Sequence, residues 1–174
     1  PMAPDTTILT AEELARIRRD YRSATLLPKR TYHDPAIHDW ERRQILRRDW
    51  VPVGRAEAPE SGSYFLTEID GDQLIVIRGR DDVVRAFHNV CRHRGTAVAE
   101  DQCGKVVRLQ CPYHAWTYDL DGSLIRAKHT DGLEDFSLDT FSLVGVRCEV
   151  WQGFVFLNLD PDATPLADQL GDLG

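Results

Sequence analysis

Four side chains of the kinds that bind metals gather within one short stretch of the sequence. Cys91 and His93 form a C-x-H pair, and after seventeen intervening residues Cys111 and His114 form a C-x2-H pair. Thiolate sulfur and imidazole nitrogen suit zinc, iron and iron–sulfur centres. Each pair follows a strand-like segment, so two loops at neighbouring strand ends could close around one centre. A metal or cluster site is therefore the first hypothesis for this stretch.

The residues alone leave three interpretations of these pairs open. They could be ordinary buried cysteines and histidines. They could form a structural zinc site, although zinc usually takes C-x2–4-C and H-x3–5-H pairs rather than mixed ones. They could also hold a [2Fe-2S] cluster in which two histidines replace two cysteines on one of the irons. Mixed pairs suit such a cluster, because each loop can give one thiolate to one iron and one imidazole to the other.

Short strands must position these loops. From Trp50 onward the sequence alternates between strand-like segments and turn signals, among them Asp121-Gly122 and Gln152-Gly153. This spacing predicts a mostly β fold, an antiparallel sandwich or open barrel. Gly95 lets the loop after Cys91 turn back, and Pro112 stiffens the loop after Cys111. The strand-like segments are 50–55, 63–69, 73–79, 83–90, 105–110, 117–120, 123–126, 143–151 and 154–159.

Two helices are expected before the strands. Thr10 and Glu13 form a T-x-x-E capping box, which predicts the start of the first helix. The second should begin at Asp34, with Pro35 in its first turn. The last residues, 161–174, are rich in proline and aspartate and read as the start of a linker.

Composition excludes several classes of partner. The 174 residues hold 21 Lys and Arg against 28 Asp and Glu, a formal net charge of -7. Such a chain has no electrostatic drive toward nucleic acid or anionic lipid. No apolar run approaches the roughly 18 residues that a membrane span needs, and no secretory signal is visible. We therefore expect a cytoplasmic protein, whose cysteines bind metal or stay free more often than they pair.

The two pairs lie in a recognisable context. CRHRG at 91–95 and CPYHAWTYDLDG at 111–122 resemble the cluster-binding signature of Rieske-type ring-hydroxylating oxygenases, in the N-terminal part of their α subunit. The flanking segments 34–55 and 151–161 are also similar to this family, so the resemblance covers roughly residues 30 to 165. Ala115 departs from the pattern, because the family commonly has glycine there. We expect the loop to be slightly stiffer but intact.

The resemblance implies a cofactor, a domain organisation and a reaction. The cofactor would be a Rieske-type [2Fe-2S] cluster held by Cys91, His93, Cys111 and His114. The helical lead-in would be 1–48, the Rieske domain 49–160, and 161–174 a linker toward a C-terminal catalytic domain. In the family that domain holds a non-haem Fe(II), which activates O2 to hydroxylate or demethylate a small organic substrate. This chain would then transfer electrons and supply no catalytic residue of its own.

The resemblance also implies partners and a subclass. The partners would be a reductase or ferredoxin as electron donor and the catalytic domain of a neighbouring subunit, with the full-length protein a homo-oligomer. Respiratory-type Rieske proteins join their two cluster loops by a disulfide. Thr96 and Tyr113 stand at the corresponding places here, so no such disulfide can form and the oxygenase or ferredoxin type is favoured.

Two other functions remain open. One is a free-standing Rieske ferredoxin, which the roughly 45 residues of helical lead-in argue against, and the other is a zinc-stabilised interaction module. Cys103 is not needed as a ligand, and Cys148 is expected to be a core thiol on a strand. Trp116 is expected to cover part of the second loop or simply to fill the core. The remaining histidines have no partner at a recognisable spacing and are expected not to be ligands: His33, His38, His88 and His129.

Overall fold

The computed structural model describes residues 8–56, 60–128, 130 and 132–173. The chain divides into two units, Pro1–Ile45 and Leu46–Gly174, and we describe each by itself.

The N-terminal unit is helical. Its elements are α1 (Ala11–Ile17), the 3-10 turn η1 (Lys29–Tyr32) and α2 (Pro35–Glu41), and α2 leads into the π-helical turn η2 (Arg42–Leu46). The expected capping box is present, because Thr10 Oγ1 accepts the Glu13 N–H at 3.2 Å and Glu13 Oε2 accepts the Thr10 N–H at 2.9 Å. The Arg30 guanidinium also binds Glu13 and lowers the pKa of that carboxyl to about 2. This ion pair fastens η1 to α1.

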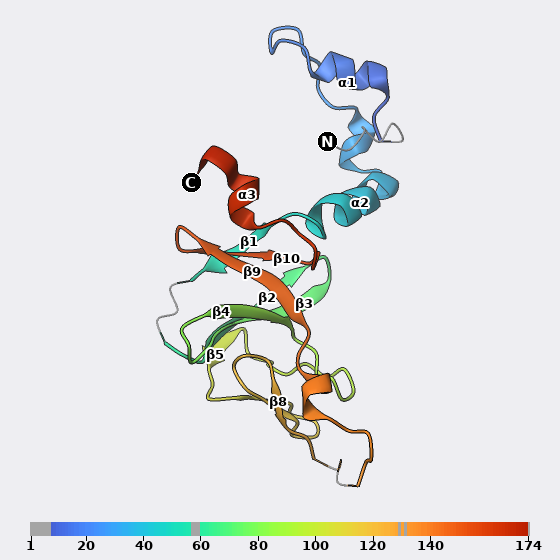
Figure 1. Cartoon of the computed structure of the whole chain (residues 1–174). Coiled ribbons are helices and arrows are strands. Elements are labelled where there is room, and N and C mark those ends of the chain that lie inside the picture. The colour runs from blue at the N-terminus through green and yellow to red at the C-terminus, as the bar shows by residue number, and fades with distance from the viewer. Residues whose placement is uncertain (1–7, 57–59, 129, 131, 174) are drawn as a thin grey trace. The chain divides into compact units, whose positions relative to one another are not determined.

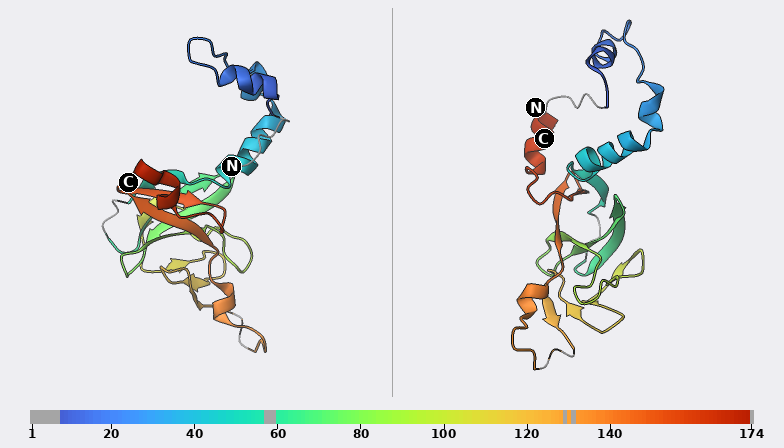
Figure 2. Two further views of the ribbon diagram at one scale, coloured as in Figure 1. Left: turned by 45° about the horizontal axis from the view of Figure 1, so that its top comes forward. Right: turned by 90° about the vertical axis from the view of Figure 1, so that its right-hand side faces the viewer.

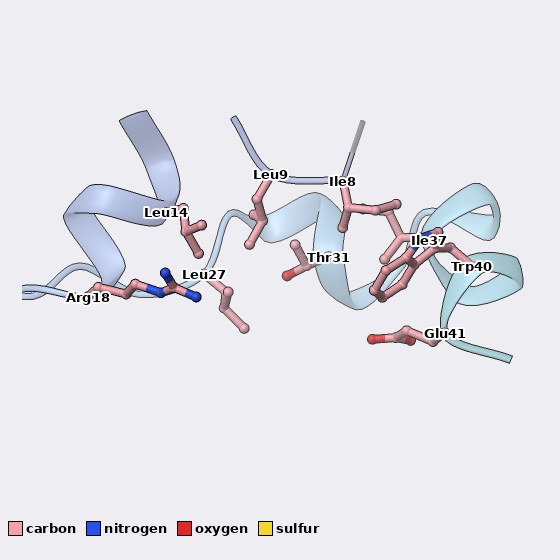
Figure 3. A pocket seen from close by; sticks show the side chains of 9 residues that line it. All are labelled: Ile8, Leu9, Leu14, Arg18, Leu27, Thr31, Ile37, Trp40 and Glu41. Atoms are coloured by element: carbon pink, nitrogen blue, oxygen red, sulfur yellow. The ribbon is translucent and has the colours of Figure 1, made fainter. Parts of the chain in front are cut away.

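Apolar side chains of the N-terminal unit surround a cavity of about 280 Å³ (Figure 3). Arg18 lies at the α1 side of this cavity, and Glu41 lies at the α2 side. The lining holds neither cysteine nor histidine, so it has no part in the metal chemistry predicted from the sequence. The remaining lining residues are Ile8, Leu9, Leu14, Leu27, Thr31, Ile37 and Trp40.

The second unit is built on a curled, wholly antiparallel sheet of seven strands in the order β1-β10-β9-β4-β3-β2-β5 (Figures 1 and 2). Its β-branched and aromatic runs form strands where the alternation predicted them. The fold class expected from the sequence is therefore confirmed. The bounds are β1 (Val51–Arg55), β2 (Ser63–Ile69), β3 (Asp72–Arg78), β4 (Val84–His88), β5 (Cys103–Lys105), β9 (Gly145–Trp151) and β10 (Phe154–Asn158).

The central strand β3 is buried on both faces. Ile75 and Ile77 belong to the core that also holds Cys91 and Cys111, and Leu74 and Val76 belong to the core shared with β10. Successive residues of a strand point to opposite faces, so one strand contributes to two cores. All four side chains are at most 2% exposed. Burial of each contributes roughly 1.5–3 kcal/mol of hydrophobic stabilisation.

A second sheet of three short strands carries the second Cys/His pair. Its strands are β6 (Leu109–Gln110), β7 (Thr117–Tyr118) and β8 (Leu124–Arg126), in the order β6-β7-β8. The second pair lies between β6 and β7, whereas the first pair follows β4. The single strand predicted at 105–110 is wrong, because β5 ends at Lys105 and pairs with β2, whereas β6 pairs with β7. Residues 106–108 carry the chain from the first sheet to the second. Within them, the Val106 N–H donates to the Gly62 carbonyl at 3.0 Å.

The last described residues pack on the β unit. Trp50 Nε1 donates to the Thr164 carbonyl at 2.9 Å, and Leu166 is 3% exposed. Leu166 opens a short helix, α3 (Leu166–Leu170), which continues into the 3-10 turn η4 (Gly171–Leu173). No helix in the part of the chain that the structure describes is long and apolar enough to cross a bilayer.

Candidate metal centre

Two loops of the same backbone design carry the four predicted ligands. In the first loop, residues 91–96, the Cys91 N–H donates to the Thr96 carbonyl at 2.8 Å, and the Gly95 N–H donates to the Cys91 carbonyl at 2.9 Å. In the second loop, residues 111–116, Cys111, Trp116 and Ala115 repeat this pattern at 2.8 and 3.0 Å. Both loops are therefore tight turns in which a cysteine stands at the first position.

The fifth residue of each loop has a positive φ, +76° at Gly95 and +56° at Ala115. Glycine adopts this left-handed region without penalty, whereas a Cβ makes it unfavourable by about 1–2 kcal/mol. The sequence predicted a slightly stiffer second loop at Ala115. The structure gives a physical reason for this expectation. Ala115 adopts the left-handed conformation that Gly95 adopts without penalty at the same position of the first loop.

The two loop cysteines are buried and adjacent. Cys91 and Cys111 are each 2% exposed, and neither forms a disulfide. Burial raises the pKa of the Cys91 thiol, and the neighbouring Cys111 raises it further, while a hydrogen bond from Tyr118 works in the opposite direction. Two thiols at one buried place can serve one metal ion, whose positive charge offsets the cost of burying them as thiolates.

The two loop histidines also lie together. The rings of His93 and His114 meet edge to face with 4.6 Å between centroids and 73° between planes. Trp116 stacks on His93 at 4.8 Å and 10°, and Tyr113 covers His114 at 3.8 Å. The Nδ1 atoms of both imidazoles are buried, and that of His114 makes no hydrogen bond to a described residue. A buried imidazole nitrogen without a donor is well suited to bind a metal.

The donor set fits a two-iron cluster. A cluster of this type takes two thiolates on one iron and two imidazoles on the other, and the two loops supply adjacent thiols and adjacent imidazoles. Among the described residues, no group of three or more Cys, His, Asp and Glu side chains surrounds a position for one ion. The two thiols lie together and the two imidazoles lie together, and this two-plus-two arrangement matches the ligand set of such a cluster.

A buried asparagine, which the sequence did not single out, holds the first loop. Asn89 is 2% exposed, and its Oδ1 accepts the N–H groups of Val98 and Ala99 at 2.9 Å each. Its Nδ2 donates to the Ala99 carbonyl at 2.8 Å. Asn89 thus ties the chain just before the loop to the chain just after it. The sequence placed Asn89 near the end of a predicted strand but gave no sign of these contacts.

Tyr118 joins the second sheet to the first loop. Its hydroxyl accepts the Arg92 N–H at 3.0 Å and lies 3.3 Å from Cys91 Sγ. A thiolate has no proton to give, so if Cys91 held a metal the tyrosine O–H would be the donor to its sulfur. The side chain is fully buried, and this burial raises the pKa of Tyr118 well above its usual value. The sequence placed Tyr118 on a strand but gave no sign of this contact.

The second loop is held from outside by an arginine. Arg80, in the turn between β3 and β4, donates to the Val107 carbonyl at 2.6 Å and pairs with Asp119. The Arg80 guanidinium lowers the pKa of Asp119 below its usual value. Arg80 therefore connects the seven-stranded sheet to the chain on both sides of the second loop.

The other cysteines lie outside the two loops. Cys103 is exposed on β5, and Cys148 packs against the core beside β10, where burial raises the pKa of its thiol to about 12. Arg92 and Arg94 are exposed in the first loop. Of the histidines expected not to be ligands, His33 and His38 belong to the N-terminal unit and His88 to β4, while His129 lies outside the described residues.

Two curated relatives of this chain are monooxygenase oxygenase subunits. The chain is 38% identical over 154 residues to the carnitine monooxygenase oxygenase subunit of Escherichia coli (strain K12), covering 88% of this chain and 41% of the relative. It is 39% identical over 165 residues to the glycine betaine monooxygenase oxygenase subunit of Chromohalobacter salexigens, covering 94% and 36%. The chain therefore spans about two-fifths of the length of these relatives.

Solved structures agree with this comparison. A crystal structure of the apo form of the quaternary ammonium Rieske monooxygenase CntA matches with a TM-score of 0.81 and 38% identity, over 86% of this chain and 44% of that one. Naphthalene 1,2-dioxygenase from Rhodococcus sp. bound to indole matches with a TM-score of 0.80 and 35% identity, over 84% and 34%. Residues 49–141, more than half of the chain, match the Rieske [2Fe-2S] domain model. By its sequence, its fold and its two paired loops, this chain belongs to the Rieske [2Fe-2S] domain family.

Proposed function

We propose that this chain is the electron-transferring part of a Rieske non-haem iron oxygenase, and that Cys91, His93, Cys111 and His114 hold its [2Fe-2S] cluster. The observation that carries the proposal is the two-plus-two arrangement of buried thiols and buried imidazole nitrogens on twin loops. When bound, the cluster accepts and gives up one electron at a time.

The four side chains have separate tasks in this proposal. Cys91 and Cys111 bind as thiolates and bring two negative charges to one iron. His93 and His114 bind through Nδ1 as neutral rings, and each keeps its proton on Nε2. Neutral ligands make an added electron easier to accommodate, so we expect a potential of roughly -150 to +300 mV rather than the about -400 mV of plant-type ferredoxins.

We also propose the organisation of the whole protein. Residues 1–48 would be a helical lead-in, 49–160 the cluster domain, and 161–174 a connection to a catalytic domain with its own non-haem iron. The relatives are oxygenase subunits that the chain covers by 36–41%, which supports such an organisation. The whole protein would act in the cytoplasm and hydroxylate or demethylate a small organic substrate with O2.

The partners follow from the same proposal. A reductase or ferredoxin would reduce the cluster, and the electron would pass to the catalytic domain of a neighbouring subunit in a homo-oligomer. A structure of the quaternary ammonium monooxygenase is described as giving insight into inter-subunit electron transfer. Relatives named for quaternary ammonium and for aromatic substrates match at similar identity, so we propose the reaction as a class.

Metal analysis and EPR test the proposal. We expect the purified chain to be red-brown, to contain about two iron and two acid-labile sulfide per chain, and to give a Rieske-type EPR signal after reduction with dithionite. Cys91→Ser should abolish this signal, while the matched Cys103→Ser, at an exposed cysteine outside the loops, should keep it. A colourless protein that contains zinc and no sulfide would overturn the proposal in favour of a zinc-stabilised interaction module.

A further inference from the structure

We propose that Trp116 is a positioning residue that fixes the orientation of the His93 ring across the gap between the two loops. The inference rests on the proposed function, because it concerns how a ligand is held. Trp116 closes the second loop, whereas His93 stands in the middle of the first. Their stacking is thus a contact between side chains that belong to different loops.

The His93 ring is held on a face and on an edge. Trp116 lies parallel to it, with 4.8 Å between centroids and 10° between planes, and His114 meets it at 73°. Rotation of an imidazole about its last side-chain bond is only weakly restrained, because that torsion has a broad energy profile. A flat neighbour on one face restricts this rotation and keeps Nδ1 on the buried side.

Trp116 is itself fixed from behind. It is 3% exposed, and the rings of Phe136 and Phe141 each meet it edge-on at 5.8 Å. These two phenylalanines stack on each other at 5.1 Å and 14°. They come from the segment between β8 and β9, outside both loops. Through Trp116, the orientation of the His93 ring therefore depends on a third part of the chain, the segment between β8 and β9.

The choice of tryptophan has a cost that space filling does not explain. Its indole Nε1 is buried and makes no hydrogen bond to a described residue. A buried donor without an acceptor is unfavourable by about 1–3 kcal/mol. Phenylalanine or leucine would fill a core position without this cost, whereas the indole offers the broadest flat face for His93. Stacking on the ligand accounts for a residue that packing alone would disfavour.

His114 is supported differently. Apart from the edge contact with His93, its ring meets Tyr113, the preceding residue of the same loop, which is 60% exposed. That contact cannot hold one loop against the other. The two histidines are therefore unequal, and loss of the Trp116 ring should disturb His93 selectively.

The test uses pulsed EPR of the reduced chain, which measures the ¹⁴N coupling of each histidine nitrogen bound to iron. Trp116→Leu removes the flat ring, Trp116→Phe keeps a smaller one, and Trp151→Leu is the matched control on β9. We expect Trp116→Leu to shift one of the two ¹⁴N couplings and to release iron to a chelator about tenfold faster, as expected for loss of an aromatic pair. Trp116→Phe should release iron at most about threefold faster than the wild type and should shift the coupling less than Trp116→Leu does. Trp151→Leu should match the wild type in both measurements.

Two results would overturn the inference while leaving the proposed function intact. One is a wild-type cluster signal with unchanged couplings in Trp116→Leu, and the other is equal impairment of Trp116→Leu and Trp116→Phe. If Trp116→Leu does not fold, Phe141→Leu decides, because it loosens Trp116 from behind and should shift the same coupling by less. Unchanged couplings there would also overturn it. A wild-type chain without iron and sulfide would instead refute the proposed function.

Discussion

The first loop, residues 91–96, and the second loop, residues 111–116, share their backbone hydrogen bonds and differ in what supports them. The first is tied internally by the buried Asn89 and touched by Tyr118. The second is held from outside by the half-exposed Arg80. The histidine also stands at the third position of one loop and the fourth of the other. The comparison teaches that the shared backbone fixes the position of the cysteine in each loop, while particular side chains determine how each loop is supported.

Removing the internal tie should have the largest effect. Asn89→Leu leaves three backbone groups of Val98 and Ala99 without partners, and each buried group left unsatisfied costs about 1–3 kcal/mol. We expect a loss of about 4 kcal/mol in the free energy of unfolding, measured with urea, together with loss of the cluster. Asn158→Leu is the control, because Asn158 is equally buried in the seven-stranded sheet. It should lower stability while the EPR signal persists.

The next effect should come from Tyr118, whose hydroxyl contacts the first loop. Tyr118→Phe removes the donor to Cys91 Sγ and the acceptor for the Arg92 N–H. A hydrogen bond to a thiolate stabilises the more negative, reduced state. We expect a redox titration to show a potential lower by on the order of 50 mV, which corresponds to roughly 1 kcal/mol for one electron. Tyr64→Phe, at another buried tyrosine, should leave the potential unchanged, and a shift of equal size there would contradict the assignment.

Glycine and alanine can be exchanged at the fifth position of the two loops. Gly95→Ala should leave both loops strained there, and Ala115→Gly should leave both relaxed. Gly95→Ala meets no atom within 4 Å, so its cost of about 1 kcal/mol is purely conformational. Ala115→Gly relieves the same strain and should raise the free energy of unfolding by about 0.5 kcal/mol, since glycine also gains freedom in the unfolded chain. Denaturation midpoints should move in opposite directions. Two shifts of the same sign would show that the loops are not equivalent.

The smallest effect should come from the external support. Arg80→Leu should cost about 0.3 kcal/mol at neutral pH, because exposed ion pairs contribute little. Arg80 lowers the pKa of Asp119 in the folded chain, so this contribution is present above the ordinary carboxyl pKa and is lost as the pH falls through the lowered value. The stability difference between wild type and variant should therefore shrink below about pH 4. A difference that persists at pH 2 would mean that the Val107 contact dominates.

Local sequence patterns were sufficient to predict the fold class and to identify the candidate ligands. Alternation predicted β2, a tight turn followed by an apolar run predicted β3, and the capping box predicted the start of α1. The run at 105–110 was mispredicted as one strand, because Lys105 pairs with β2 whereas Leu109 and Gln110 pair with β7. Propensity describes a residue, whereas the sheet it joins is decided by contacts distant in sequence.

The residues that support the candidate site could not be predicted from the sequence, for a related reason. Asn89, Tyr118 and Trp116 act through partners in other segments, and none of them stands at a spacing that marks its role. Cysteine and histidine are recognisable because few residue types bind iron. Asparagine, tyrosine and tryptophan occur in many settings, so only the folded chain reveals which backbone group or ring each one meets. Ligation by the four loop residues stays a prediction until the metal is measured.

Strand β3 has a consequence for how this unit comes apart. Because Ile75 and Ile77 serve one core while Leu74 and Val76 serve the other, neither core can melt while the strand stays in place. Opening is then cooperative across both sheets, and the β3 amides should be the slowest in the chain to exchange with deuterium. Thermal loss of iron and thermal loss of the sheet should accordingly occur in one transition.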